Sequence, residues 1–201
     1  GVMVKPYGKR IPVKLVSYDD QSNTATAATL SNQLITQDKV DLLVSDSGSV
    51  LTSVAVPIAR EHKKLLFDQT GTGGTFFTDD NPYIALMSDP VSTIWPKYIA
   101  DFLTKEGPKL GIKRIALLYA TNDFTGTQAN AVRDFIKKSG APVELVYDKG
   151  VPTNTTNYTV LINNIRLAKP DAVIEMGYPG NDIAFLRNLH DSGTQRSEER
   201  R

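Results

Sequence analysis

Short apolar runs alternate with amphipathic stretches along this chain, and each run ends in small polar residues. In residues 41–75, the runs 42–44 and 65–67 suit strands that are covered on both faces of a sheet. Between these runs, apolar side chains recur every four residues from Val50 to Ile58, which predicts a helix that begins near Val50. The segment therefore has the strand–helix–strand order of a parallel α/β sheet.

The same alternation extends over most of the chain. The pattern predicts further strands over residues 11–17, 83–87, 113–119, 143–147 and 171–176. It predicts helices that begin at residue 23 or 24 and that cover 92–106, 127–139, 158–168 and 181–191. Two runs of such units indicate an α/β fold with two doubly wound parallel-sheet domains. We place the boundary at residues 88–90, which gives a first domain of residues 1–89 and a second of 90–201.

Two polar loops follow the neighbouring strands of the central segment. Residues 45–49 (SDSGS) follow the first strand, and residues 70–74 (TGTGG) follow the second. Because the carboxyl ends of parallel strands share one edge of a sheet, we expect the two loops to face each other. Hydroxyl groups, backbone N–H groups and the positive end of a helix would then point at one small volume. That arrangement suits an anion such as a carboxylate.

Each of these features also has an ordinary structural interpretation. Ser49 suits the N-cap of the helix that follows it, which is the commoner role of serine at such a position. Gly71, Gly73 and Gly74 are typical turn residues. The sequence alone leaves the structural and the ligand-binding interpretations open.

Composition excludes several classes of function. The chain has no cysteine, so disulfides, thiolate nucleophiles and cysteine-based metal sites are excluded. The formal net charge is +1 and the basic residues are scattered, so neither a nucleic-acid partner nor a membrane-surface partner is indicated. No apolar run is long enough to span a bilayer, and no signal-peptide pattern begins at Gly1. The chain therefore acts in the cytoplasm or follows a leader that has been removed.

No motif for covalent chemistry or cofactor binding emerges. The loop GTGGT at residues 71–75 lacks the Lys-Ser/Thr pair of a phosphate-binding P-loop. His62 and His190 have no second histidine or carboxylate at metal-ligand spacing. Trp95 lies at helical spacing with Tyr98 and Phe102, which is typical of a helix core, and it is kept as a secondary ligand candidate. We expect no metal and no cofactor.

Five segments together resemble a known family. They are residues 8–20, 47–59 (SGSVLTSVAVPIA), 69–73 (QTGTG), 114–124 (RIALLYATNDF) and 170–180 (PDAVIEMGYPG). In this order and spacing they resemble the type 1 periplasmic solute-binding proteins, and within them the leucine/isoleucine/valine-binding receptors of ABC transporters. The resemblance covers roughly residues 8–193.

The resemblance implies a receptor with two α/β lobes that close on a small carboxylate-bearing ligand and deliver it to a membrane permease. It favours an amino acid with an apolar side chain, no enzymatic activity, and a periplasmic or otherwise extracytoplasmic location with the signal peptide outside this chain. Ser49 resembles the serine that binds the ligand carboxylate. Gly71 matches the residue whose carbonyl meets the ligand ammonium, and Thr72 the threonine that contacts both groups. Phe124 stands where the family usually has tyrosine, and Tyr178 matches an aromatic residue of the second lobe.

Two departures from the family pattern leave the ligand class open. The first strand and helix of the family have no counterpart, and neither has the acidic residue that pairs with the ligand ammonium beyond the position of Ser192. We therefore expect the chain to be a fragment, and an amine-free aromatic or aliphatic acid fits the visible residues nearly as well as an amino acid. A ligand-sensing regulatory protein on the same fold is the second hypothesis. An enzyme of the doubly wound class is the weakest, because no nucleophile–base pair or metal cluster is found.

Overall fold

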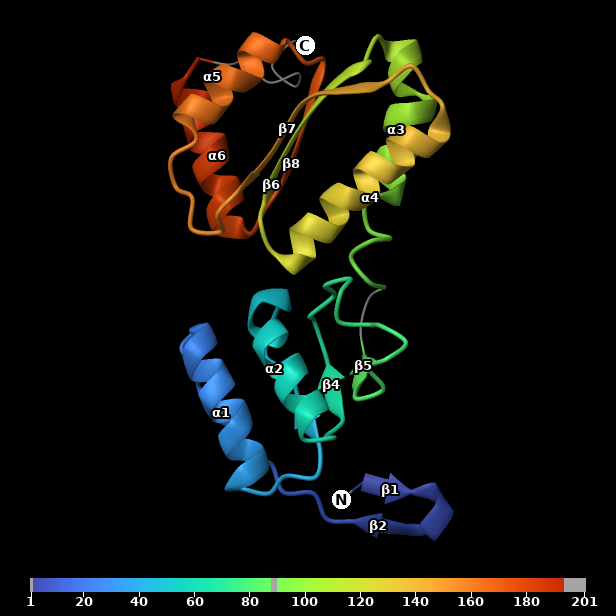
Figure 1. Cartoon of the computed structure of the whole chain (residues 1–201), viewed down its shortest axis with the longest axis vertical. Helices are drawn as coiled ribbons and strands as arrows, with labels where there is room; N and C mark the ends of the chain where they lie inside the picture. Colours follow the sequence, from blue (N-terminus) through green and yellow to red (C-terminus); the bar gives the residue numbers. More distant parts are fainter. Residues whose placement is uncertain (1, 88–89, 194–201) are drawn as a thin grey trace.

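Two layered α/β assemblies follow each other along the long axis of the molecule (Figure 1). This computed structural model describes residues 2–87 and 90–193. The N-terminal assembly comprises the elements α1 to β5, and the C-terminal assembly comprises α3 to α6. Of the predicted boundary at residues 88–90, the first two residues lie outside the described part of the chain. The division into two domains stays a prediction.

The N-terminal assembly is a parallel sheet whose inner face is covered by two helices. Its strands lie in the order β3-β4-β5 and are β3 (Leu43–Val44), β4 (Leu66–Asp68) and β5 (Ile84–Leu86). The helices are α1 (Thr24–Thr36) and α2 (Ser49–Glu61). The buried core joins helix and strand side chains: Ile35, Leu43, Ala55, Ala59 and Leu66. Because successive strand residues point to opposite faces, Val44 is directed away from this core and is 64% exposed.

The C-terminal assembly is a doubly covered parallel sheet. Its strands lie in the order β7-β6-β8 and are β6 (Arg114–Ala120), β7 (Glu144–Val151) and β8 (Ala172–Met176). The helices are α3 (Lys97–Lys105), α4 (Asp123–Ser139), α5 (Thr159–Ala168) and α6 (Pro179–Asp191). On β6, Leu118 packs with α5 and α6, whereas Leu117 packs with α4. Successive side chains of β6 therefore pack into the two cores on opposite faces of the sheet, as expected for a parallel strand that is buried on both faces.

The N-terminal residues differ from the prediction. A strand was expected over residues 11–17, but the chain forms an antiparallel hairpin of β1 (Val2–Val4) and β2 (Lys9–Ile11), separated by the 3-10 turn η1 (Lys5–Tyr7). Residues 12–20 have no regular structure. Val13 is 68% exposed and Leu15 is 82% exposed, so the apolar pattern that predicted the strand has no packing partner in the described structure.

Two helix starts also differ from the prediction. α4 begins at Asp123 and not at residue 127, because the Asn122 side chain accepts hydrogen bonds from the backbone N–H groups of Phe124 and Thr125 at 2.8 and 3.1 Å. α3 begins at Lys97 and not at residue 92, with Pro96 as the residue before its first turn. A second 3-10 turn, η2 (Gly107–Leu110), follows α3. The earlier start of α4 places Phe124 in a helical first turn.

Candidate ligand-binding site

The two polar loops face each other as predicted. The Gly48 backbone N–H donates to Thr70 Oγ1 at 2.7 Å, and the Gly73 N–H donates to Ser49 Oγ at 3.1 Å. Ser49 is only 2% exposed and is the first residue of α2, whereas Gly48, at φ 85°, occupies the N-cap position. The N-cap interpretation of Ser49 is therefore wrong. The Ser49 side chain instead joins the start of α2 to the neighbouring loop.

Thr72 presents a buried hydroxyl group without a partner. The residue is 3% exposed, and Oγ1 makes no hydrogen bond to any described residue. The Thr72 carbonyl accepts from the Ser92 N–H at 2.7 Å, which fixes the backbone of the loop. A buried hydroxyl that is left unpaired costs free energy. Thr72 therefore has hydrogen-bonding capacity that a ligand could use.

Gly71 lies directly above two side-chain oxygens. A Cβ atom built on Gly71 would be 2.5 Å from Thr52 Oγ1 and 2.7 Å from Asp68 Oδ2. The Gly71 N–H donates to Asp68 Oδ1 at 2.6 Å, so the loop is drawn down onto these groups. Only glycine fits this close approach. Packing therefore requires glycine at position 71, in addition to the role that the resemblance implies.

Three aromatic rings gather on the C-terminal side. The Phe124 and Tyr178 ring centroids are 5.7 Å apart, and the Trp95 ring meets Phe124 edge-on at 5.1 Å. Trp95 precedes α3 and its Nε1 donates to the Pro90 carbonyl at 2.6 Å. The prediction that Trp95 belongs to a helix core is wrong, since Tyr98 of the same pattern is 83% exposed. The two aromatic residues singled out in the sequence, Phe124 and Tyr178, therefore lie side by side, and Trp95 packs against Phe124.

The loop also contacts the C-terminal assembly through one carboxylate. Asp123, in the first turn of α4, accepts from the Thr75 N–H at 3.2 Å and from Thr75 Oγ1 at 2.6 Å. Ser92, whose N–H donates to the Thr72 carbonyl of the loop, also shares a short hydroxyl–hydroxyl hydrogen bond with Thr127 of α4. The Asp123 contact was not predictable from the sequence, because Thr75 and Asp123 are 48 residues apart and no pattern in their two segments relates one to the other.

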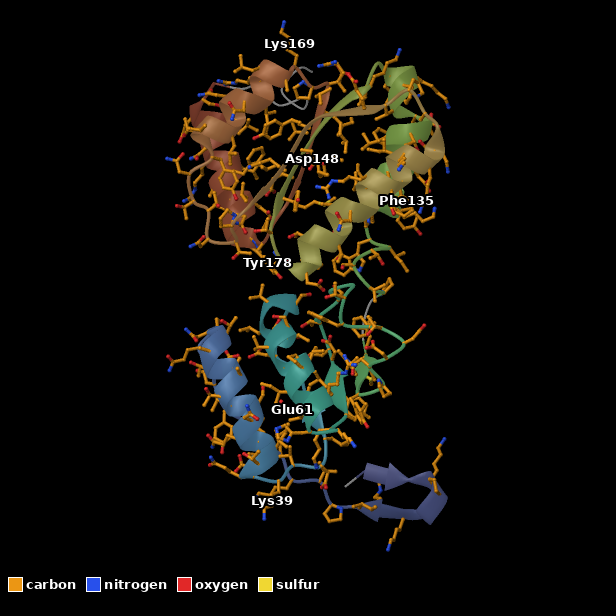
Figure 2. All side chains as sticks on the ribbon, viewed as in Figure 1. Lys39, Glu61, Phe135, Asp148, Lys169 and Tyr178 are labelled. Carbon is orange, nitrogen blue, oxygen red and sulfur yellow. The ribbon has the colours of Figure 1, made fainter. Side chains whose placement is uncertain are left out.

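Tyr178 reaches from the C-terminal assembly toward the start of α2, and Figure 2 shows it at the end of that assembly that faces α2. Its hydroxyl oxygen is buried and forms no hydrogen bond that meets ordinary geometric limits with the described residues. Burial raises the pKa of the Tyr178 phenol; the backbone N–H of Val50 opposes that change, and the charge of Asp123 adds to it. The phenol therefore stays neutral and lies near the positive end of α2.

Comparison with known proteins identifies the family of this chain. A family model described as periplasmic binding protein matches residues 5–198. The chain belongs to the periplasmic binding protein family. The resemblance to the type 1 proteins of the leucine/isoleucine/valine-binding branch is confirmed.

Two curated relatives are described as Leu/Ile/Val-binding protein homologs. The Leu/Ile/Val-binding protein homolog 3 of Brucella melitensis is 24% identical over 193 residues, which are 94% of this chain and 49% of that protein. The Leu/Ile/Val-binding protein homolog 7 of Brucella suis is 25% identical over 113 residues, 56% of this chain and 27% of that protein. The chain thus spans between about a quarter and a half of the length of these relatives.

Solved structures share the fold. The substrate binding protein LivJ of Streptococcus pneumoniae, in complex with isoleucine, superposes with a TM-score of 0.75 at 22% identity over 91% of this chain and 50% of that one. A solute binding protein of Rhodopseudomonas palustris in complex with 4-hydroxybenzoate gives a TM-score of 0.72 at 19% identity, over 89% and 47%. These likenesses confirm the α/β fold of this periplasmic binding protein.

A pair of carboxyl groups lies beside Tyr178 in this binding protein. A Cβ atom on Gly177 would be 2.6 Å from Asp182 Oδ1 and 2.9 Å from Glu175 Oε1, so both carboxyls crowd the same turn. Burial, together with a hydrogen bond to Asp182 and the charge of that residue, raises the pKa of Glu175 to about 8. The Tyr158 hydroxyl faces the pair and accepts from Asn181 Nδ2 at 3.2 Å. Glu175 therefore holds a proton near neutral pH.

Within the described ranges, no cluster of three or more histidine, cysteine, aspartate or glutamate side chains is arranged so that it could hold a metal ion. Among the helices that the structure describes, none has the length and apolar character needed to cross a membrane.

We expect Gly71→Ala to destabilise the protein by about 1–3 kcal/mol, because the added methyl group overlaps Thr52 and Asp68 beneath the loop. The matched control is Gly126→Ala within α4, where a Cβ meets no atom within 4 Å. That change should be neutral or stabilise by about 0.5–1 kcal/mol, since alanine is the better helix former. Urea unfolding of both variants measures the difference, and equal stabilities would contradict the packing argument.

We expect Glu175→Gln to reduce the dependence of stability on pH. The pKa of Glu175 is raised from 4.5 to about 8 in the folded protein, so across that window the folded state holds the additional proton. Stability that is fully present below about pH 4.5 therefore decreases as the pH rises to about 8. Free energies of unfolding at pH 5, 6.5 and 8 should fall less steeply for Glu175→Gln than for the wild type. The control is Glu61→Gln, at an exposed position, which should keep the wild-type slope. If the slope of Glu175→Gln equals that of the wild type, the raised pKa of Glu175 is contradicted.

Proposed function

We propose that this chain is the ligand-binding part of an extracytoplasmic receptor of an ABC importer. It binds a small carboxylate-bearing ligand between two closing lobes, formed by residues 1–89 and 90–201. The observation that carries the proposal is the buried, unpartnered hydroxyl of Thr72 beside Ser49 at the start of α2. Membership of the periplasmic binding protein family supports it.

The ligand carboxylate is assigned to the N-terminal assembly. The Ser49 hydroxyl and the first-turn N–H groups of α2, which have no acceptor within the helix, offer donors, and the helix dipole favours a negative group there. The Gly71 carbonyl accepts from the ligand ammonium, and Thr72 Oγ1 contacts both groups. These roles follow the family resemblance, and the buried position of Ser49 and Thr72 is consistent with them.

The ligand side chain is assigned to the aromatic cluster of Phe124, Tyr178 and Trp95. Phe124 offers no hydroxyl group, so its wall of the site is apolar and favours an apolar side chain. An amino acid of that kind is our first proposal, in line with the isoleucine bound by the LivJ neighbour. An amine-free aromatic acid is the second, because another neighbour of the same fold holds 4-hydroxybenzoate.

The function requires no covalent step. A ligand that touches Ser49 and Thr72 on one assembly and Phe124 and Tyr178 on the other binds the closed arrangement more tightly than an open one. It therefore shifts the population toward closure, by the ratio of its two affinities. The closed form is the one that a membrane permease would receive.

Thermal melting against a ligand panel tests this function. The panel holds leucine, valine, phenylalanine, benzoate and glucose as an uncharged control. A ligand at about a hundred times its dissociation constant should stabilise the folded state by roughly 2.7 kcal/mol. Stabilisation by any of the carboxylates, with none by glucose, supports the proposal. A cooperatively melting chain that responds to no carboxylate contradicts it.

We expect Thr72→Val to weaken binding of a stabilising ligand several-fold while leaving the free protein as stable as before. Valine keeps the volume of threonine, and the hydroxyl that it removes has no partner in the free protein. Ser49→Ala should also weaken binding several-fold, and it should loosen the loop because the Gly73 N–H loses its acceptor. Titration calorimetry measures both effects.

The control for these variants is Ser53→Ala, an exposed serine on the same helix whose hydroxyl donates to the Val50 carbonyl. It should bind the ligand like the wild type. If Thr72→Val and Ser49→Ala retain wild-type affinity as well, the assigned site is wrong.

A further inference from the structure

Asp68 is a buried carboxylate beneath the Gly71–Thr72 loop. It is the last residue of β4 and is 0% exposed. One oxygen, Oδ1, accepts from Ser45 Oγ at 2.9 Å, from the Thr70 N–H at 3.2 Å and from the Gly71 N–H at 2.6 Å. Three donors that converge on one oxygen are the hydrogen-bonding pattern of a carboxylate. The group is therefore fixed in place by the loop that the proposed site is built on.

The other oxygen of Asp68 has no partner. Oδ2 is buried, makes no hydrogen bond with the described residues, and lies 2.7 Å from the position that a Cβ of Gly71 would take. Thr52 Oγ1, equally buried and unpartnered, lies 2.5 Å from the same point. No lysine, arginine or histidine in the described ranges forms an ion pair with Asp68. A buried charge without a counter-charge is costly, and a cationic ligand group nearby would offset that cost.

We propose that Asp68 is a specificity-determining residue, whose buried carboxylate selects ligands that carry an ammonium group over amine-free acids. This inference rests on the proposed function, in which the Gly71 carbonyl accepts from the ammonium. Asp68 lies directly behind that residue and is fully buried. It acts through its charge, which attracts the ammonium of a zwitterion and repels a ligand that carries only a carboxylate.

The buried position makes this effect strong and insensitive to salt. At 0.1 M salt, interactions between exposed charges are largely screened beyond about 10 Å, but interactions of buried charges are screened much less. The negative charge of Asp68 belongs to the N-terminal assembly. It is distinct from the acidic residue that the family resemblance places beyond Ser192. It also separates the two ligand classes of the proposed function, since an amino acid contains the ammonium and a benzoate lacks it.

Asp68→Asn tests the charge without dismantling the loop. The amide oxygen can keep the three donors of Oδ1, and the amide NH₂, placed where Oδ2 was, lies close to the free Thr52 Oγ1. The probes are two pairs that differ only in the amine: leucine with 4-methylpentanoate, and phenylalanine with 3-phenylpropanoate. Titration calorimetry gives the ratio of the two affinities within each pair.

We expect the wild type to prefer the amino acid of at least one pair. Asp68→Asn should lower that preference about tenfold or more, which corresponds to about 1.4 kcal/mol. Asp68→Ser serves as a second variant, because it also removes the charge and leaves a hydroxyl acceptor for the Gly71 amide. The control is Asp79→Asn, which removes an exposed negative charge from the same assembly and should leave the ratio unchanged.

The outcomes separate this inference from the proposed function. If the wild type binds a probe and the ratio is the same in a cooperatively folded Asp68→Asn or Asp68→Ser variant, the role of Asp68 is overturned while the receptor function stands. An equal change in Asp79→Asn also overturns it, because any negative charge would then suffice. Binding of none of the four probes by the wild type contradicts the proposed function and this inference together.

Discussion

The parallel pairing of β3 with β4 is the constraint on which the candidate site depends. Leu43 lies opposite Leu66 and Val44 opposite Phe67, so the two strands end side by side. The polar residues that follow are then linked across the edge, with the Ser45 N–H donating to the Phe67 carbonyl and Ser45 Oγ to Asp68. A slip of one residue would turn Leu43 and Leu66 out of the core, so burial of these side chains fixes the register and, with it, the position of the loops.

The loop that follows β4 has two roles at once. Its inner residues supply the groups assigned to the ligand, and its outer residue Thr75 is held by Asp123 at the start of α4. Ser92, which precedes α3, donates its N–H to the Thr72 carbonyl. A change in how the two assemblies lie against each other must therefore move or break contacts of the loop itself. In the proposed function, this short segment would couple ligand binding to closure, and no longer pathway would be required.

Much of this arrangement was predictable from the sequence, and the rest was not for identifiable reasons. The facing of the two loops follows from the rule that parallel strands end at one edge, which needs only the strand–helix–strand pattern. The helical position of Phe124 was missed because a single capping residue, Asn122, extends α4 by four residues beyond its apolar pattern. The strand expected at residues 11–17 fails because an apolar pattern forms a strand only where a neighbour exists to pair with it. Contacts such as that of Thr75 with Asp123 depend on the tertiary structure alone.

The candidate site contains opposite polarities a few residues apart. The start of α2 presents N–H groups beside Ser49, whereas the buried carboxylate of Asp68 lies under Gly71. A ligand with one charge satisfies one of these environments and is opposed by the other, while a zwitterion satisfies both. The unpartnered oxygens of Thr52, Asp68 and Thr72 are consistent with a site whose free form is less favourable than its occupied form. Since a receptor responds only through the difference between its two states, such unmet polar groups increase the free energy that a matching ligand can contribute to closure.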